Sequence, residues 1–246
     1  MNKSQARKHV WKTLIEVAEP DSRYHFNFNE FIPDFEGSEQ ATRRLADMPI
    51  YLNAKNVFIT PDNCLEDLRE QVLLDGKTQV ISTYGIRRGL VELRPGDVPS
   101  HLAKYAVLLD VMEDVGRYIS LTELRERRLT FDWLITGASA VNQNGVRFGK
   151  GHGFFDLEWA MLYEIGAVTV HTPVIAFVHD CQVVDVDFEL SPFDTVCDYI
   201  ITPTRTLQID QPQKPTQGVI WEKLEPGMLE NIPLLKELKS MDFQTD

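Results

Sequence analysis

The stretch Gly145-Val-Arg-Phe-Gly149-Lys-Gly151-His-Gly153-Phe-Phe-Asp156 follows an apolar, strand-like run at Phe131–Thr136 and opens a helix-like run at Leu157–Glu164. Glycine permits positive φ and carries no side chain, so successive backbone N–H groups can converge on one anion. The following helix adds the positive end of its dipole. Because Arg147 and Lys150 lie within the loop, the pattern predicts phosphate binding. A glycine-rich turn with solvated basic residues is the alternative.

Outward from this loop, short apolar runs alternate with helix-like runs, which predicts βαβ units. We expect an α/β fold with a mainly parallel sheet and helices on both faces. Strands are expected at 56–60, 79–83, 105–110, 131–136, 174–178 and 199–202. Helices are expected at 3–18, from 37 (with Ser38 as N-cap) to about 48, at 63–75, 121–128 (capped by Ser120 or Thr122), 157–165 and 232–238. The segment 84–104 is expected to consist of turns.

The domain organisation follows from the same pattern. Residues 1–209 are expected to form one α/β domain, and residues 210–246 a C-terminal appendage packed on it. Lys3 and Arg7 are four residues apart on the first predicted helix, so both project from one side. That side is either a phosphate-binding surface or a solvated basic face.

Composition excludes several classes of protein. The chain has 246 residues and a net charge of −12, which argues against nucleic-acid binding as the main activity. Its three cysteines lie far apart, which is typical of reduced thiols and not of a zinc site. No apolar run reaches the roughly 18–20 residues that span a bilayer. We therefore expect a cytoplasmic protein without membrane contact, either a monomer or a homodimer.

The glycine-rich loop resembles the signature G-x-R-L-G-x-G-x-G-Y-Y-D of the 5-formyltetrahydrofolate cyclo-ligase family. Six positions match: Gly145, Arg147, Gly149, Gly151, Gly153 and Asp156. Phe148 replaces the leucine, and Phe154 and Phe155 replace the two tyrosines. The resemblance extends over residues 3–205. It implies a fold similar to those of sugar-phosphate isomerases and CoA transferases.

The resemblance also implies an activity, the ATP- and Mg²⁺-dependent conversion of 5-formyltetrahydrofolate to 5,10-methenyltetrahydrofolate, with ADP and phosphate as products. Arg147 and Asp156 would be catalytic. The ATP-binding residues would be Lys3, Arg7, Arg147, Gly149, Lys150, Gly151 and Gly153. Phe154, Phe155 and His179 would contact the reduced folate, and Asp156 and Asp180 would bind the metal.

Two of these assignments have structural alternatives. His179 and Asp180 follow the predicted strand 174–178, at the edge of the sheet where ligands collect, but they would equally suit a capped turn. Asp156 opens a helix and would equally suit its N-cap. The run from Val178 to Asp185 resembles a V-H-D-x-Q-V-x-D element of a cyclo-ligase-like branch of the family, and Thr202–Thr204 resembles a T-P-T motif. Asp194 receives no role.

Departures from the family pattern leave turnover open. Asn142 stands where the enzymes of the family usually carry Asp, and the Tyr hydroxyls are lost at Phe154 and Phe155. An ATP- or folate-binding regulatory protein without cyclo-ligase turnover is therefore the alternative function. A sugar-phosphate or CoA-ester enzyme on the same fold is a third. Lys3, Arg7 and the complete glycine loop favour ATP over that third option.

Overall fold

An eight-stranded sheet forms the centre of the computed structural model, which describes residues 3–241. Its strands lie in the order β11 (Thr206–Gln208), β10 (Tyr199–Ile201), β8 (Val174–Phe177), β5 (Trp133–Gly137), β1 (Asn56–Ile59), β2 (Thr78–Ser82), β3 (Leu90–Leu93) and β4 (Arg117–Ile119). The neighbours from β10 to β2 pair in parallel, and the outer strands pair antiparallel. The predicted α/β fold with a mainly parallel sheet is confirmed.

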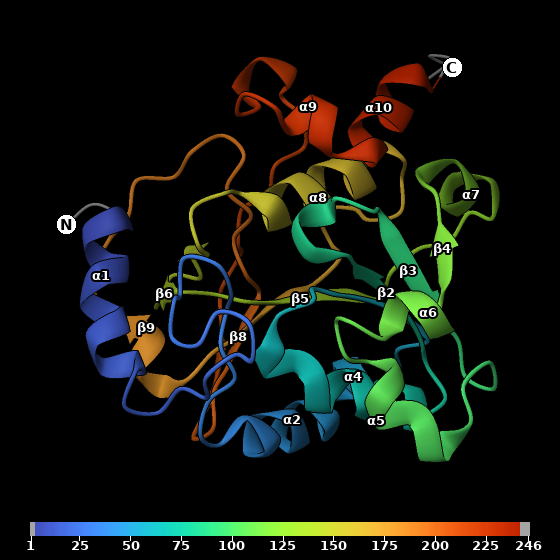
Figure 1. Ribbon diagram of the computed structural model, residues 1–246. Coiled ribbons are helices and arrows are strands. Elements are labelled where there is room, and N and C mark those ends of the chain that lie inside the picture. Colours follow the sequence, from blue (N-terminus) through green and yellow to red (C-terminus); the bar gives the residue numbers. More distant parts are fainter. Residues whose placement is uncertain (1–2, 242–246) are drawn as a thin grey trace.

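Helices cover both faces of this sheet (Figure 1). On one face lies α8 (Phe154–Glu164), and on the other lie α2 (Ser38–Ala46), α3 (Pro49–Leu52) and α4 (Glu66–Leu74). Side chains alternate between the faces along each strand, as the pleat requires. Phe58 and Leu134 therefore pack in the cluster of α8, whereas Val57 and Ile135 pack in the cluster of α2 and α4.

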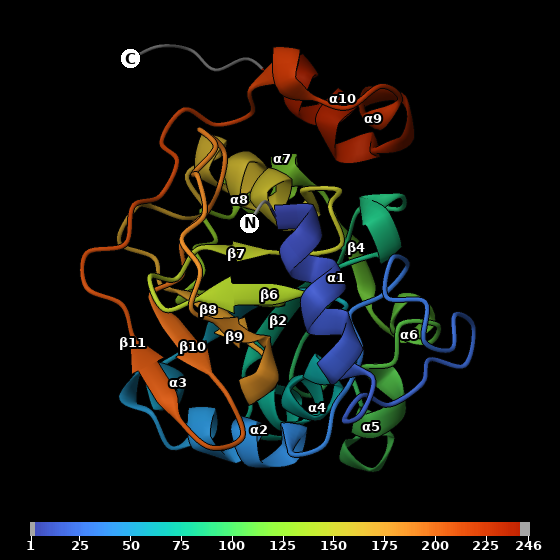
Figure 2. The same cartoon turned by 90° about the vertical axis from the view of Figure 1, so that its left-hand side faces the viewer.

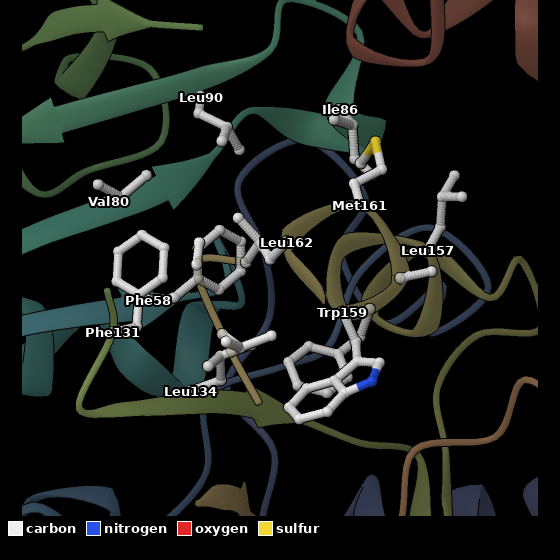
Figure 3. Close-up of a cluster of buried hydrophobic side chains, with 14 of the residues drawn as sticks. Phe58, Val80, Ile86, Leu90, Phe131, Leu134, Leu157, Trp159, Met161 and Leu162 are labelled. Carbon is white, nitrogen blue, oxygen red and sulfur yellow. The ribbon is translucent and has the colours of Figure 1, made fainter. Parts of the chain in front are cut away.

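The layer beneath α8 holds large apolar side chains (Figure 3). Trp159 and Leu162 of α8 lie in one buried cluster with Phe58, Val80 and Leu134 of the strands, and each of the five is at most 1% exposed. Burying a side chain of this size contributes about 1.5–3 kcal/mol. This packing fixes the position of α8, and with it the position of the loop that precedes the helix.

Helix α1 (Lys3–Leu14) lies beside a small second sheet made of β7 (Arg147–Phe148), β6 (Ala140–Asn142) and β9 (Val183–Val184) (Figure 2). Its apolar residues Ala6, Val10 and Leu14 pack in one cluster with Ala140 and Phe148. Lys3 and Arg7 line the cavity beside the glycine-rich loop, and Arg7 Cζ lies 5.9 Å from the centroid of the Phe148 ring. The helix is shorter than the predicted 3–18.

The remaining helices are short: α5 (Ala103–Ala106), α6 (Met112–Val115), α7 (Leu121–Glu126), α9 (Met228–Asn231) and α10 (Pro233–Ser240). The C-terminal segment packs on α8: Leu234, Leu235 and Leu238 join its cluster, and Trp159 donates a 3.1 Å hydrogen bond to the Pro215 carbonyl. The boundary at residue 209 stays a prediction, and residues 1–2 and 242–246 lie outside the described part.

Some predicted elements are wrong. The run 105–110 is not a strand, because α5 ends at Ala106 and turns follow, burying Val107 and Leu109 against β3. Short apolar runs suit a helix or a strand equally, so periodicity could not decide. The segment 84–104, predicted to consist of turns, contains strand β3. Its charged residue Glu92 interrupts the apolar run, so the sequence pattern did not indicate a strand. Gly37, not Ser38, is the N-cap of α2, whereas Ser120 caps α7 as one alternative predicted.

Residues 3–241 contain no helix that is both long enough and apolar enough to cross a membrane.

Candidate active site

A cavity of about 300 Å³ opens at the carboxyl ends of β1, β2 and β5. Strand β1 leads to α4 on one face of the sheet, and the neighbouring strand β5 leads to α8 on the other. Such a switch point leaves a crevice between the diverging connections, and open α/β sheets bind ligands there. Thr60 and Asp62 after β1, Ser82 of β2 and Gly137 of β5 contribute to the cavity wall. The position of the cavity is therefore a consequence of the topology.

The structure brings ten of the twelve predicted site residues to this cavity. They are Lys3, Arg7, Arg147, Gly149, Lys150, Gly151, Gly153, Phe154, Phe155 and Asp156. They come from α1, from β7, from the glycine-rich loop and from the first turn of α8. The two that lie elsewhere are His179 and Asp180.

Glycine is required at two positions of the loop. Gly151 has φ +117°, and a Cβ there would lie 2.8 Å from Arg7 Nη1. Gly153 has φ +67° and is the N-cap of α8, without a side chain to bond the first-turn amides. Helix α8 therefore begins at Phe154 and not at Leu157. Its first amides face the cavity region, where they suit an anion.

The cations around the loop are held by specific contacts. Arg7 Nη1 donates to the Gly149 carbonyl at 3.2 Å, and Lys3 forms an ion pair with Asp194. Lys150 Nζ donates to the Glu30 carbonyl at 2.9 Å and lies 5.0 Å from the centroid of the Tyr84 ring. Burial lowers the pKa of Lys150 and of Arg7. Burial thus makes a counter-anion more favourable for both cations.

Arg147 and Asp156 form a buried ion pair with an Nη2–Oδ1 distance of 2.7 Å. The guanidinium also lies 4.1 Å from the centroid of the Phe155 ring, and Thr195 N donates to Asp156 Oδ1 at 2.9 Å. Burial raises the pKa of Asp156, although Arg147 acts against this rise. Asp156 is the third residue of α8, so the alternative of Asp156 as its N-cap is wrong.

His179 and Asp180 form a capped turn outside the cavity. His179 Nδ1 accepts a hydrogen bond from Cys181 N at 3.2 Å, and the His179 ring packs edge-on against Phe35. Asp180 accepts hydrogen bonds from Thr202 and Thr204, which explains the T-P-T motif as a partner of this turn. Of the two interpretations offered by the sequence, the geometry favours the structural one. It does not support substrate binding by His179 or metal binding by Asp180.

Three acidic residues in the cavity wall were not predicted: Asp62, Glu158 and Asp194. Asp194 accepts a 2.7 Å hydrogen bond from Ser191 N in addition to its pair with Lys3. Glu158 is 3% exposed although it carries a carboxyl group. One feature of the sequence could have indicated that Glu158 is unusual. Glu158 lies three residues after Phe155 and four before Leu162, within the apolar side of the helix, where a carboxylate is unexpected.

Asn142 lies away from the cavity. Its Oδ1 accepts hydrogen bonds from Asn144 N at 3.0 Å and Val146 N at 2.9 Å, and its Nδ2 donates to the Val186 carbonyl at 3.1 Å. The side chain is therefore occupied with the turn between β6 and β7. The hypothesis that Asn142 replaces a carboxylate at the reacting centre finds no support in this geometry.

Asp156 and Asp194 together fit a magnesium ion that accompanies a nucleotide. Residues 3–241 contain no group of three or more His, Cys, Asp or Glu side chains arranged for a metal. Magnesium at a nucleotide usually takes only one or two carboxylates and obtains further oxygens from the phosphates and water. Asp156 and Asp194 both line the cavity, and the charge of Asp194 contributes to the raised pKa of Asp156. Two carboxylates beside the glycine-rich loop are a donor set that such an ion could use.

Fold and site define an α/β protein with a glycine-rich loop beside a cavity at the switch point of its sheet. Comparison with known families matches residues 1–203 to the 5-formyltetrahydrofolate cyclo-ligase family. The chain belongs to this family, which confirms the resemblance of the glycine-rich loop.

Two relatives of this chain are methenyltetrahydrofolate synthase domain-containing proteins. The methenyltetrahydrofolate synthase domain-containing protein of Homo sapiens is 36% identical over 253 residues, which cover 99% of this chain and 63% of that protein. Its counterpart in Mus musculus is 32% identical over 250 residues, covering 99% of this chain and 65% of that protein. The chain thus spans less than two thirds of the length of these two relatives.

A solved structure supports the fold. The 5,10-methenyltetrahydrofolate synthetase of Aquifex aeolicus has a TM-score of 0.51 and is 18% identical, covering 87% of this chain and 96% of the other. At this identity the likeness concerns the fold alone.

Proposed function

We propose that the protein catalyses the ATP-dependent cyclisation of 5-formyltetrahydrofolate to 5,10-methenyltetrahydrofolate, with ADP and phosphate as the other products. The single observation that carries this proposal is the convergence of the glycine-rich loop, the start of α8 and the cations of α1 on one cavity at the switch point. Membership in the cyclo-ligase family supplies the reaction class.

The phosphates of ATP are assigned to the end of the cavity formed by Lys3, Arg7 and the loop. Backbone amides at a helix start and flanking cations bind phosphate oxygens without covalent chemistry. Phosphoryl transfer depends mainly on positioning and on neutralising the charge of the transferred group. Arg147 is a buried cation that contacts two residues of the first turn of α8, Asp156 and Phe155.

The reaction balances as two steps. The formyl oxygen attacks the γ-phosphorus and ADP leaves. The N10 nitrogen then attacks the activated formyl carbon, loses its proton, and the oxygen leaves with the phosphate. The site must therefore hold the formyl group near the phosphates and exclude water. Phe154 and Phe155, which line the cavity, would pack on the folate.

Magnesium would be held by Asp156 and Asp194, and it would supply positive charge beside the phosphates. When the ion is bound, Lys3 would exchange its contact with Asp194 for a phosphate oxygen. We also propose that the protein acts in the cytoplasm, where its three free cysteines would stay reduced.

A direct assay tests the proposal. Purified protein is incubated with 5-formyltetrahydrofolate and Mg-ATP, while the absorbance of the methenyl product and the release of ADP are followed together. We expect both products in equal amounts. Binding of ATP and folate without either product would support the regulatory alternative.

Lys3→Ala is the variant that tests the phosphate assignment. Loss of a charge-assisted contact costs about 1.5–3 kcal/mol, so the affinity for Mg-ATP should fall about 10-fold or more. Lys8→Ala is the matched control, because Lys8 lies on the same helix and is exposed. Equal affinities of the two variants in calorimetry would remove Lys3 from the nucleotide site.

A further inference from the structure

Glu158 is the feature of the cavity that phosphate binding does not explain. The residue lies in the second turn of α8 and lines the cavity, and only 3% of it is exposed. No cation among residues 3–241 forms an ion pair with it, and its Oε2 atom has no hydrogen-bond partner among them. An unpartnered buried carboxyl group is costly, so stability gives no reason for it.

The surroundings of Glu158 are also incompletely satisfied. Ser82 lies close enough for its hydroxyl to favour the charged form of Glu158, yet that hydroxyl has no hydrogen bond of normal geometry among the described residues. Arg147 Nε is a third buried atom of the cavity wall without a partner. Three unpartnered polar groups in one wall indicate that a ligand completes their hydrogen bonds.

The acidic character of this wall restricts the ligand. Asp62 lines the same cavity at the end of β1 and accepts hydrogen bonds from Thr60 and from Gly137 N. Its charge is among the influences that raise the pKa of Glu158, after burial itself. Carboxyl groups at this end of the cavity suit a hydrogen-bond donor better than a phosphate. The matching group is a donor-rich ring edge with adjacent N–H groups, which a carboxylate can bind with both oxygens.

We propose that Glu158, supported by Ser82 and Asp62, binds the N–H donor edge of a heterocyclic ligand. This inference rests on the proposed function, in which that ligand is the 2-amino-4-oxopyrimidine ring of the reduced folate. The ring presents its 2-amino group and the neighbouring ring N–H side by side. Glu158 thereby orients the folate with its pyrimidine at the acidic end and its formyl group toward the phosphates.

Glu158→Gln is the test variant, because it keeps the shape of the side chain but cannot offer two acceptor oxygens. Its affinity for 5-formyltetrahydrofolate and for 6-methyltetrahydropterin should fall at least 10-fold in calorimetry, while its affinity for Mg-ATP stays within 2-fold. Glu126→Gln is the matched control on an exposed helix position of α7. Thermal melts of both variants show that they are folded.

An analogue of the folate tests the contact from the ligand side. Replacing the 2-amino group by methyl should weaken binding to the unaltered protein by about 10-fold, and should weaken it little further in Glu158→Gln. Equal losses in both proteins, or unchanged affinities in Glu158→Gln, would overturn the inference.

The outcomes separate this inference from the proposed function. If the Glu158→Gln variant cyclises 5-formyltetrahydrofolate as well as the unaltered protein does, the function is supported and Glu158 is removed from ligand binding. A protein that binds the tetrahydropterin through Glu158 but forms no methenyl product supports the inference and contradicts the function. If the unaltered protein binds neither ligand, both are wrong.

Discussion

Two buried glutamates in this molecule have opposite surroundings. Glu92 lies on β3 near the edge of the sheet and accepts hydrogen bonds from Arg94, Arg117 and Arg127. Although burial alone would raise the pKa of Glu92, these arginines lower it to about 2. Glu158 lies in the cavity wall without a cation, and burial raises its pKa to about 8. A fully compensated carboxylate is typical of structure, and an uncompensated one beside a cavity is typical of a binding site.

The same substitution at the two positions should therefore have unequal effects on stability. Glu92→Gln removes the charge that three arginines share, and we expect the free energy of unfolding to fall by about 3 kcal/mol, near the low end for a broken buried pair because the arginines are 32–46% exposed. Glu158→Gln, which replaces a protonated carboxyl group, should change it by less than about 1 kcal/mol at pH 5. Denaturant unfolding measures both. Similar losses would contradict the contrast.

The pH dependence of stability should sharpen the contrast between Glu158 and Glu92. The folded-state pKa of Glu158 lies above its usual value of 4.5, so the folded protein holds a proton that the unfolded chain has lost. Stability from this group is complete below about pH 4.5 and is lost as the pH rises toward 8. Relative to Glu158→Gln, the unaltered protein should lose about 3–4 kcal/mol between pH 5 and 8.

The pH dependence of the stability that Glu92 contributes has the opposite sign. Its stabilisation is present above its usual pKa of 4.5 and is lost as the pH falls toward about 2. Unfolding curves of the two Gln variants and the unaltered protein across pH give both trends. Parallel curves for Glu158→Gln and the unaltered protein would show that Glu158 is not buried as a neutral acid.

Asn142→Asp should have the smallest effect on stability of the substitutions considered. Asn142→Asp exchanges the Nδ2 donor for an acceptor that faces the Val186 carbonyl, so we expect a loss of about 1–2 kcal/mol. Turnover should not rise, because the side chain belongs to the hairpin and not to the cavity. A gain in methenyl formation without a loss of stability would restore the hypothesis that this position acts at the reacting centre. Thermal melts and the absorbance assay on the same sample decide.

The sequence predicted the central parallel strands, the helices on both faces and ten of the residues that line the cavity. It succeeded where glycines and buried apolar runs force one local structure, as in the loop before α8. It failed where a contact depends on distant parts of the chain. His179 and Asp180 share a strand-end position with Asp62, but only the switch between β1 and β5 opens a crevice there. The roles of Glu158 and Asp194 depended on neighbours that sequence spacing does not reveal.

The ion pair between Lys3 and Asp194 joins residues 191 positions apart in the chain. At about 5–20 residues per second of synthesis, Lys3 would wait about 10–40 s for its partner. Helix α1 can form early, but the end of the cavity that contains Lys3 is not complete until Asp194 has been made. Ribosome-bound chains that end before Asp194 should therefore bind Mg-ATP far more weakly than released protein. Binding of Mg-ATP would then follow the completion of this part of the fold and would not assist the early steps of folding.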